Sequence, residues 1–378
     1  MLSSTMKKIL LIDDSLAILN LLEHFLSKQY AVRRAENGKE GLEVLSQFNP
    51  DLILVDLLMP VMDGITAIGE IRKLYDGANL PIIVLSGVEE KDQRVKALNA
   101  GANDFVSKPF DKTELLSRIA NNLSVSELSK ELARTNRTLQ EEKRLARNIQ
   151  ESILPSKLDF DCLEVATFYQ ASNQLGGDFF DAWEKDNKIH LLIADVSGHG
   201  TGSALLMAAC KSIFYTLGQS LSDPLAIIVE ANRIICEMVE ASGMFLTAVY
   251  ALFDKELEEL QVVSAGHNPV FMMDQSGVNP IASTGIPLGL FQENAWEVSK
   301  VPFQAGQTLF MYTDGLVEST NQQEEMYGEE LLLPALQKEK EGSPQKIVDS
   351  IFQSVKEYCN DQFNDDLTIL VIKRVCPA

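Results

Sequence analysis

The stretch from residue 124 to residue 153 contains neither glycine nor proline, and it separates two parts of the chain that have different patterns. Its apolar residues recur at heptad spacing. One seam position carries Val125, Leu132, Leu139, Ala146 and Ile153, and the other carries Leu128 and Ile149, with Thr135 and Glu142 interrupting it. This narrow seam between polar flanks predicts a helix of roughly four heptads that pairs as a coiled coil. Pro155 marks its end.

Two other structures are compatible with this stretch: a single helix packed on a neighbouring domain, and an exposed, solvated helix. The narrow seam favours pairing, so we expect a homodimer held by this helix. The chain then divides into an N-terminal domain (1–123), a helical coiled-coil linker (124–155) and a C-terminal domain (156–378). Its 378 residues are enough for two or three domains with cores of their own.

The N-terminal part alternates short apolar runs with helix-like stretches. The runs cover residues 8–12, 31–35, 51–55, 81–85 and 104–107, and the helix-like stretches lie near 15–27, 38–47, 64–75, 90–100 and 111–122. This alternation predicts an α/β fold, a doubly wound, flavodoxin-like sheet of five parallel strands. In such a sheet, functional groups gather at the carboxyl ends of the strands.

Polar side chains stand at four of these strand ends. Asp13 and Asp14 follow the first run, Asp56 the third, Ser86 the fourth and Lys108 the fifth. A single loop aspartate is usually only solvated, but carboxylates that converge on one sheet edge provide the oxygen ligands that Mg²⁺ requires. We therefore predict a Mg²⁺ site with a cation on its rim.

These residues lie in motifs that resemble the receiver domain of bacterial two-component response regulators over residues 6–122. The motifs are Asp13-Asp14, Asp56 with Met59-Pro60 and Met62-Asp63-Gly64, Ser86-Gly87, and Lys108-Pro109-Phe110. The resemblance implies that Asp56 receives a phosphoryl group from a histidine kinase. It also implies that Asp14, Asp56 and the backbone carbonyl of Leu58 bind Mg²⁺, with Asp13 acting through water.

The resemblance also implies a switch. Lys108 would hold a phosphoryl oxygen, Ser86 would move to another, and Phe105 would turn inward as Ser86 moves. Lys108 and Mg²⁺ would thus neutralise the phosphoryl dianion on Asp56, and the movement of Ser86 would report its presence. The Lys108–Pro109 peptide bond is expected to be cis.

The C-terminal part contains four acidic clusters, each at the end of a strand-like run. They are Gly176-Gly177-Asp178-Phe179-Phe180-Asp181, Ala194-Asp195-Val196-Ser197-Gly198-His199-Gly200, Tyr312-Thr313-Asp314-Gly315 and Asn364-Asp365-Asp366-Leu367-Thr368. Any one of them alone is typical of a turn. Together they indicate a site for two divalent metal ions that hydrolyses a phosphate ester.

The C-terminal part also contains many short apolar runs, with a few helical stretches between these runs. This pattern predicts an α+β sandwich.

The clusters resemble the metal-dependent protein serine/threonine phosphatases of type 2C, and most closely their bacterial SpoIIE branch, over about 146–374. Further matching motifs are Ile149-Gln150-Glu151-Ser152-Ile153-Leu154-Pro155, Ala265-Gly266-His267-Asn268-Pro269 and Leu288-Gly289. The resemblance implies two Mn²⁺ or Mg²⁺ ions. Their ligands would be Asp178, Asp195, the carbonyl of Val196, Asp314 and Asp365, with Asp195 bridging. For Asp181 and Asp366 a supporting role is expected.

The two resemblances together imply a response regulator whose output is a protein phosphatase. By family analogy its substrate is a phosphoserine on an anti-sigma factor antagonist, in a partner-switching pathway. The alternative is a non-catalytic receiver–phosphatase-like adaptor that regulates a sigma factor by binding. The intact carboxylates argue against this adaptor. Whether phosphorylation activates or inhibits, and which kinase acts, stay open.

The charge of the chain excludes some classes of partner. The formal net charge is −21, which argues against nucleic acid and anionic membranes, because their phosphates are bound by clustered Lys and Arg. The longest apolar run, 244–253, falls well short of the roughly 20 residues that span a membrane. The N-terminus lacks the apolar core of a signal peptide, and the five cysteines show no pairing pattern. We therefore expect a cytoplasmic protein.

Overall fold

The structure is a computed structural model, and it describes residues 6–87, 91–155, 157–172, 175–282, 285–293 and 295–375. The chain forms two compact units, residues 1–140 and residues 141–378, called here the N-terminal and C-terminal units. Within the described ranges, no helix combines the length and the apolar character that crossing a membrane requires.

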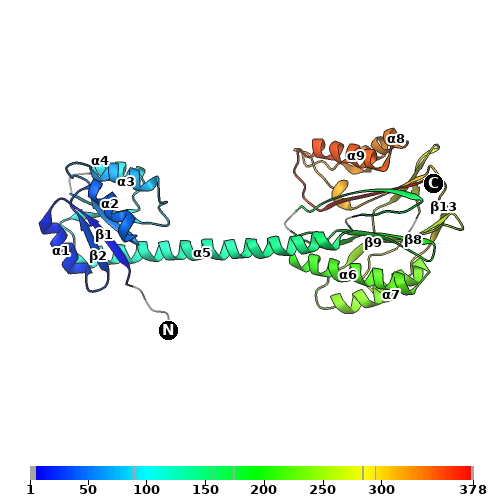
Figure 1. Cartoon of the computed structure of the whole chain (residues 1–378), viewed down its shortest axis with the longest axis horizontal. Helices are drawn as coiled ribbons and strands as arrows, with labels where there is room; N and C mark the ends of the chain where they lie inside the picture. The colour runs from blue at the N-terminus through cyan, green and yellow to red at the C-terminus, as the bar shows by residue number, and fades with distance from the viewer. Residues whose placement is uncertain are drawn as a thin grey trace. The chain divides into compact units, whose positions relative to one another are not determined.

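The N-terminal unit is built on a parallel five-stranded sheet with the order β2-β1-β3-β4-β5. Figure 1 labels β1 and β2 of this sheet, with helices beside them. The strands are β1 (Lys8–Ile12), β2 (Ala31–Ala35), β3 (Leu52–Asp56), β4 (Ile82–Gly87) and β5 (Asp104–Lys108). Helices α1 (Leu16–Leu26), α2 (Gly38–Phe48), α3 (Gly64–Arg72) and α4 (Lys91–Asn99) alternate with them. The predicted doubly wound fold is confirmed.

Both faces of the central strands β1, β3 and β4 are buried, which explains why these strands are mainly apolar, whereas the edge strands β2 and β5 contain polar residues that are not buried. One core includes Leu10, Ile53 and Val84, and the other includes Leu11, Leu54 and Ile83, so successive residues of one strand serve opposite faces. Polar side chains cap the N-termini of helices α2 and α3. The Asn37 side chain accepts from the amide of Glu40 ahead of α2, and the Asp63 side chain accepts from that of Thr66 ahead of α3.

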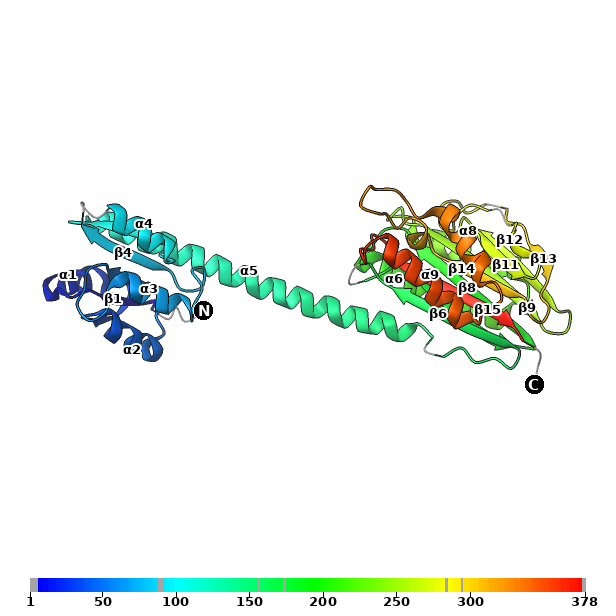
Figure 2. The same cartoon turned by 90° about the horizontal axis from the view of Figure 1, so that it is seen from above.

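Helix α5 runs without interruption from Lys112 to Ile153, whereas the sequence predicted a receiver helix over 111–122 and a separate linker helix (Figure 2). The physical reason is that no glycine or proline lies between these ends to stop the helix. The apolar seam side chains Val125, Leu128, Leu132, Leu139 and Ile149 are between 48% and 65% exposed in the single chain.

The C-terminal unit contains two antiparallel five-stranded sheets, ordered β13-β10-β9-β8-β7 and β12-β11-β14-β15-β6. The first contains β7 (Phe179–Lys185), β8 (Lys188–Val196), β9 (Leu246–Asp254), β10 (Glu259–Ala265) and β13 (Ser299–Pro302). The second contains β6 (Leu163–Gln170), β11 (Val270–Asp274), β12 (Gly277–Ile281), β14 (Thr308–Tyr312) and β15 (Leu367–Arg374). The sheets face each other across a shared apolar core that includes Ile193 and Leu370.

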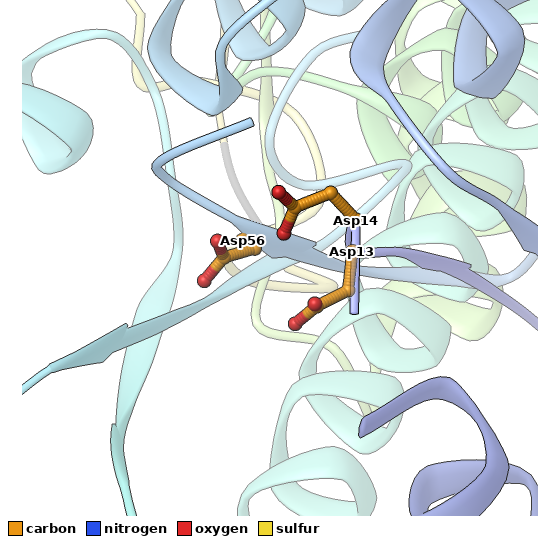
Figure 3. A group of neighbouring side chains, drawn as sticks. All are labelled: Asp13, Asp14 and Asp56. Atoms are coloured by element: carbon orange, nitrogen blue, oxygen red, sulfur yellow. The ribbon is translucent and has the colours of Figure 1, made fainter. Parts of the chain in front are cut away.

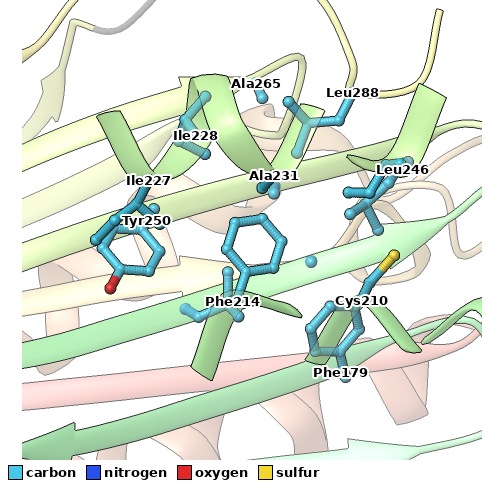
Figure 4. Close-up of a cluster of buried hydrophobic side chains, with 14 of the residues drawn as sticks. Phe179, Cys210, Phe214, Ile227, Ile228, Ala231, Leu246, Tyr250, Ala265 and Leu288 are labelled. Carbon is cyan, nitrogen blue, oxygen red and sulfur yellow. The ribbon is translucent and has the colours of Figure 1, made fainter. Parts of the chain in front are cut away.

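Helices cover the outer faces of this sandwich. Helices α6 (Thr201–Ser220) and α7 (Pro224–Val239) pack on the first sheet around Phe214 and Tyr250 (Figure 4). Helices α8 (Gly328–Glu339) and α9 (Pro344–Tyr358) pack on the second, and the short 3₁₀ helix η1 (Asp314–Leu316) follows β14. The predicted α+β sandwich is confirmed as four layers, helices outside and sheets inside.

Candidate functional sites

Three carboxylates of the N-terminal unit gather at the carboxyl ends of β1 and β3, as predicted (Figure 3). Each of Asp13, Asp14 and Asp56 offers one oxygen, and these oxygens all lie within 4.8 Å of one another. Asp13 and Asp56 are buried, while Asp14 is exposed. Hard oxygen ligands at this separation are suited to Mg²⁺.

Lys108, at the end of β5, donates hydrogen bonds from Nζ to Asp13 Oδ2 over 2.7 Å and to Asp56 Oδ1 over 2.6 Å. Burial raises the pKa of Asp56, and the bond from Lys108 opposes this. Burial alone would lower the pKa of Lys108, but its two carboxylate partners raise it overall. The Lys108–Pro109 bond is cis, as expected. The ammonium group of Lys108 therefore offsets part of the negative charge of Asp13 and Asp56.

The two predicted switch residues are joined by a residue that the sequence did not indicate. Arg94 on α4 donates from Nε to Ser86 Oγ over 2.7 Å and from Nη2 to the carbonyl of Gly87 over 2.7 Å. Its guanidinium also lies 4.9 Å from the centre of the Phe105 ring. Ser86 is fully buried, whereas the side chain of Leu58 is exposed. No motif includes Arg94, so only the fold reveals it.

In the C-terminal unit, Asp178 is the most buried of the predicted carboxylate ligands, at 1% exposure. Its Oδ2 accepts hydrogen bonds from the hydroxyl groups of Thr313 and Thr368, each over 2.6 Å. Within the described part of the chain, its Oδ1 has no hydrogen-bond partner. Burial and the nearby charge of Asp195 raise the pKa of Asp178 well above its usual range. A buried carboxylate oxygen with no donor is suited to a cation.

Asp195 lies near the end of β8, Asp314 begins η1 just after β14, and Asp365 lies in the turn before β15. Burial, followed by the charges of Asp314 and Asp365, raises the pKa of Asp195. Burial, followed by the charge of Asp365, raises the pKa of Asp314 to about 6. Such repulsion requires that the carboxylates be neutralised by protons or by cations. Among the described residues, a cluster of oxygens within 4.8 Å of one another is found only in the N-terminal unit.

The loop that carries Asp178 is fastened by Asp366. Asp366 Oδ2 accepts from the amide of Gly177 over 2.6 Å, and Oδ1 accepts from the amide of Ser172 over 2.8 Å. A side chain at Gly177 would collide with the carbonyl oxygen of Val196, because its Cβ would lie 2.5 Å from that atom. The carbonyl of Val196, a predicted metal ligand, therefore lies against this loop. The carboxylate of Asp366 binds the backbone amides of Ser172 and Gly177.

Asp181 lies apart from this carboxylate group. Its side chain forms a buried ion pair with Lys211 of α6, and its Oδ1 accepts from the amide of Ala182 over 2.9 Å. Both residues line a cavity of about 560 Å³ that is also lined by Trp183 and Ile153. The structure thus assigns Asp181 to the packing between β7 and α6.

Two families match separate parts of the chain. Residues 9–120 match the family described as Response regulator receiver domain, and residues 185–375 match the one described as Stage II sporulation protein E (SpoIIE). Both resemblances that the motifs indicated are thereby confirmed.

Individual relatives match each part in turn. Chemotaxis protein CheY of Halobacterium salinarum is 36% identical over 119 residues, which cover 31% of this chain and 98% of CheY. Phosphoserine phosphatase RsbU of Bacillus subtilis is 27% identical over 237 residues, which cover 61% of this chain and 69% of RsbU. The solved SiaA-PP2C domain of Pseudomonas aeruginosa superposes with a TM-score of 0.58 at 19% identity, covering 63% of this chain and 98% of that domain. At that identity the likeness shows the fold alone.

Proposed function

The chain belongs to the family described as Stage II sporulation protein E (SpoIIE) and carries a receiver domain ahead of that match, and from this premise we propose that it is a response regulator controlling a metal-dependent protein serine/threonine phosphatase. One observation carries the catalytic part. The Asp178 carboxylate is buried, two hydroxyls hold one of its oxygens, and the other oxygen has no donor among the described residues. An ionised group in that position needs a cation.

Two Mn²⁺ or Mg²⁺ ions fit this set of ligands, because both accept carboxylate and carbonyl oxygens. Asp178, Asp195, Asp314, Asp365 and the carbonyl of Val196 would hold them. When bound, such a pair supplies a nucleophile from water at neutral pH and neutralises charge on the phosphoryl group. Thr313 and Thr368 keep the Asp178 side chain in one orientation, and Asp366 keeps the loop ahead of it in place.

The receiver part of the proposal rests on Asp56 and Lys108. Asp56 would accept the phosphoryl group from a histidine kinase, and Mg²⁺ would be held by Asp13, Asp14, Asp56 and the carbonyl of Leu58. Lys108 already contacts the Asp56 carboxylate, so it is placed to neutralise the new dianion.

For the substrate we propose a phosphoserine protein, an anti-sigma factor antagonist in a partner-switching pathway. The support is the likeness to a protein named as a phosphoserine phosphatase, RsbU. The chain spans 69% of that relative, and the substrate is carried over by analogy.

The exposed apolar seam of α5 supports a homodimer. Leu128, Leu132 and Leu139 are between 48% and 64% exposed in the single chain. A second copy of the same helix would bury them in a coiled coil.

The test is phosphate release from phosphoserine proteins by the full chain, with Mn²⁺ or with a chelator. We expect Mn²⁺-dependent release that Asp195→Asn abolishes. Treatment with a small phosphodonor should change the rate of the parent protein and leave that of Asp56→Asn unchanged. Release that persists in the chelator, or that Asp195→Asn retains, contradicts the metal-dependent mechanism. Binding of a phosphoserine protein without release from any substrate indicates the adaptor instead.

A further inference from the structure

A cavity of about 560 Å³ lies between β7 and α6 of the C-terminal unit. Ile153, at the end of α5, and Ala182 of β7 contribute apolar surface to it. Among the described residues that line it, none is a predicted metal ligand. Proteins bind small molecules in pockets of roughly 300–1,000 Å³ that are mostly apolar and contain a few polar groups. The cavity therefore has the size of a small-molecule site, separate from the proposed metal centre.

The indole of Trp183 forms part of the cavity wall, and its N–H group distinguishes it from the other tryptophan. Trp183 is 9% exposed, and its Nε1 has no hydrogen-bond partner in the described part of the chain. Trp296 is 5% exposed, and its Nε1 donates to the carbonyl oxygen of Ile286 over 3.0 Å. Buried donors are normally satisfied by the protein, by water or by a ligand. The Trp183 N–H group therefore favours a molecule in the cavity that supplies an acceptor.

The ammonium group of Lys211 is the second donor in the cavity wall. The Lys211 side chain is 13% exposed and pairs with Asp181, its one acceptor among the described residues. An ammonium group carries three N–H donors. Each carboxylate oxygen of Asp181 already accepts one hydrogen bond, from Lys211 and from the amide of Ala182. The polar part of the wall therefore has more donors than acceptors, and it favours a ligand that brings acceptor oxygens.

Aromatic rings form a rigid apolar side of the cavity. The Trp183 ring stacks on that of His190, with 5.0 Å between the ring centres. Tyr215 of α6 also lines the cavity, and its ring meets that of Trp183 edge-on, with 5.3 Å between the centres. Tyr215 is 48% exposed, so its ring has surface left to cover. Planar rings pack favourably against such aromatic edges and faces.

We propose that this cavity binds a small planar organic anion, an aromatic carboxylate. Its carboxylate accepts hydrogen bonds from the Lys211 ammonium group and from the indole N–H group of Trp183, and its ring packs beside Tyr215. The apolar part of the wall favours such a ligand over an inorganic anion, because an inorganic anion would leave that surface uncovered. The proposal does not depend on the proposed phosphatase function, since the residues that it uses are not the predicted metal ligands.

The experiment titrates the full chain with cinnamate and with cinnamamide, which has the same planar body but no charge. The two tryptophans of the chain are isotopically labelled, and NMR follows their indole N–H signals. Trp183→Phe assigns these signals. The double variant Asp181→Leu with Lys211→Met removes the ammonium group without leaving an unpaired carboxylate. Lys188→Met is the matched control, because Lys188 pairs with Asp254 and does not line the cavity.

We expect saturable binding of cinnamate that moves the Trp183 signal downfield, because the indole proton gains an acceptor, and that leaves the Trp296 signal in place. The parent should bind cinnamate about tenfold more tightly than cinnamamide, because hydrogen bonds between charged groups are stronger than those to a neutral acceptor. Lys188→Met should keep this preference, whereas the double variant should lose it. Trp183→Phe, measured on the signals of the ligand, should weaken cinnamate binding severalfold.

A Trp183 signal that stays in place up to millimolar cinnamate overturns the proposal, and so does unsaturable movement of both tryptophan signals. Equal affinity of the parent for the two compounds shows a merely apolar pocket and refutes the anion. A preference for cinnamate that the double variant retains refutes the role of Lys211. If Trp183→Phe fails to fold, Trp296→Phe assigns the signals, and the titrations of the parent and the double variant decide the question.

Discussion

Arg94 donates a hydrogen bond from Nε to Oγ of Ser86 over 2.7 Å, inside the predicted receiver switch. The same guanidinium lies over the Phe105 ring. In the proposed switch, Ser86 would exchange this bond for one to a phosphoryl oxygen on Asp56. If Ser86 and Phe105 form the proposed switch, Arg94 would restrain both residues in the unphosphorylated arrangement.

Replacing Arg94 should make the phosphorylated conformation easier to reach. We expect Arg94→Ala to bind beryllofluoride, a phosphoryl mimic, about tenfold more tightly, since a hydrogen bond from a charged donor is lost in the resting state only. Fluorine NMR titration of the full chain with Mg²⁺ present measures this. Arg118→Ala is the control, because Arg118 lies 5.8 Å from the same ring but pairs with Asp104. Unchanged affinity in Arg94→Ala would show that Arg94 does not restrain the switch.

The hydroxyl groups that hold Asp178 provide a second prediction. Thr313→Val and Thr368→Val should each raise the Mn²⁺ concentration for half-maximal phosphate release by roughly tenfold, because the proposed metal ligand Asp178 loses an orienting donor. Thr308→Val is a matched control on β14. Thr308 is fully buried, and its hydroxyl has no partner within the described ranges. We expect this variant to behave like the parent, and an equal effect at all three positions would refute the orienting role.

Local patterns in the sequence predicted the sheet of the N-terminal unit and the residues at its strand ends, because strands β1, β3 and β4 are mainly apolar and helix-like stretches separate all five strands. In the C-terminal unit, strands such as β6, β7 and β13 mix polar with apolar residues, so their bounds come from the structure. Local patterns missed the partners of Asp178, since Thr313 lies 135 positions away along the chain. The hydroxyls stand inside the quoted motifs, yet only the pairing of β14 with β15 shows that both face one carboxylate. Which oxygens bind metal in the C-terminal unit stays a prediction.

The ion pair between Asp181 and Lys211 is buried, with side chains 9% and 13% exposed. Asp181→Ala should therefore destabilise the C-terminal unit by about 3 kcal/mol, because the ammonium group of Lys211 loses its partner. The double variant Asp181→Leu with Lys211→Met should recover most of that loss. Urea unfolding followed by tryptophan fluorescence measures this, since both tryptophans, Trp183 and Trp296, lie in this unit. A double variant as unstable as the single one would contradict the pairing.

The seam of α5 predicts the oligomeric state. Leu132→Glu and Leu139→Glu place charges in the proposed coiled coil, and we expect each to convert a dimer into a monomer. Light scattering after size-exclusion chromatography measures the mass of the full chain. Arg134→Glu, on the same helix but outside the seam, is the control. A parent protein that is already monomeric at high concentration would exclude the homodimer.

The burial of His190 leads us to expect that the stability of the protein depends on pH. Its Nδ1 lies 2.6 Å from the hydroxyl of Tyr250, and its ring stacks on Trp183. Burial lowers the pKa of His190 to about 4, against 6.5 for an ordinary histidine. Between these values the unfolded chain binds a proton that the folded protein does not. Stability from this residue is therefore fully present above pH 6.5 and is lost as the pH falls toward 4.

By pH 5 this loss should amount to about 2 kcal/mol in the free energy of unfolding relative to pH 7.5. His190→Gln, which keeps an acceptor for the Tyr250 hydroxyl, should remove that part of the pH dependence. His24→Gln should leave it intact, because His24 is exposed on α1. Urea titrations followed by tryptophan fluorescence at several pH values supply the comparison. If the parent and His190→Gln lose stability in parallel down to pH 5, His190 is not held neutral in the folded protein.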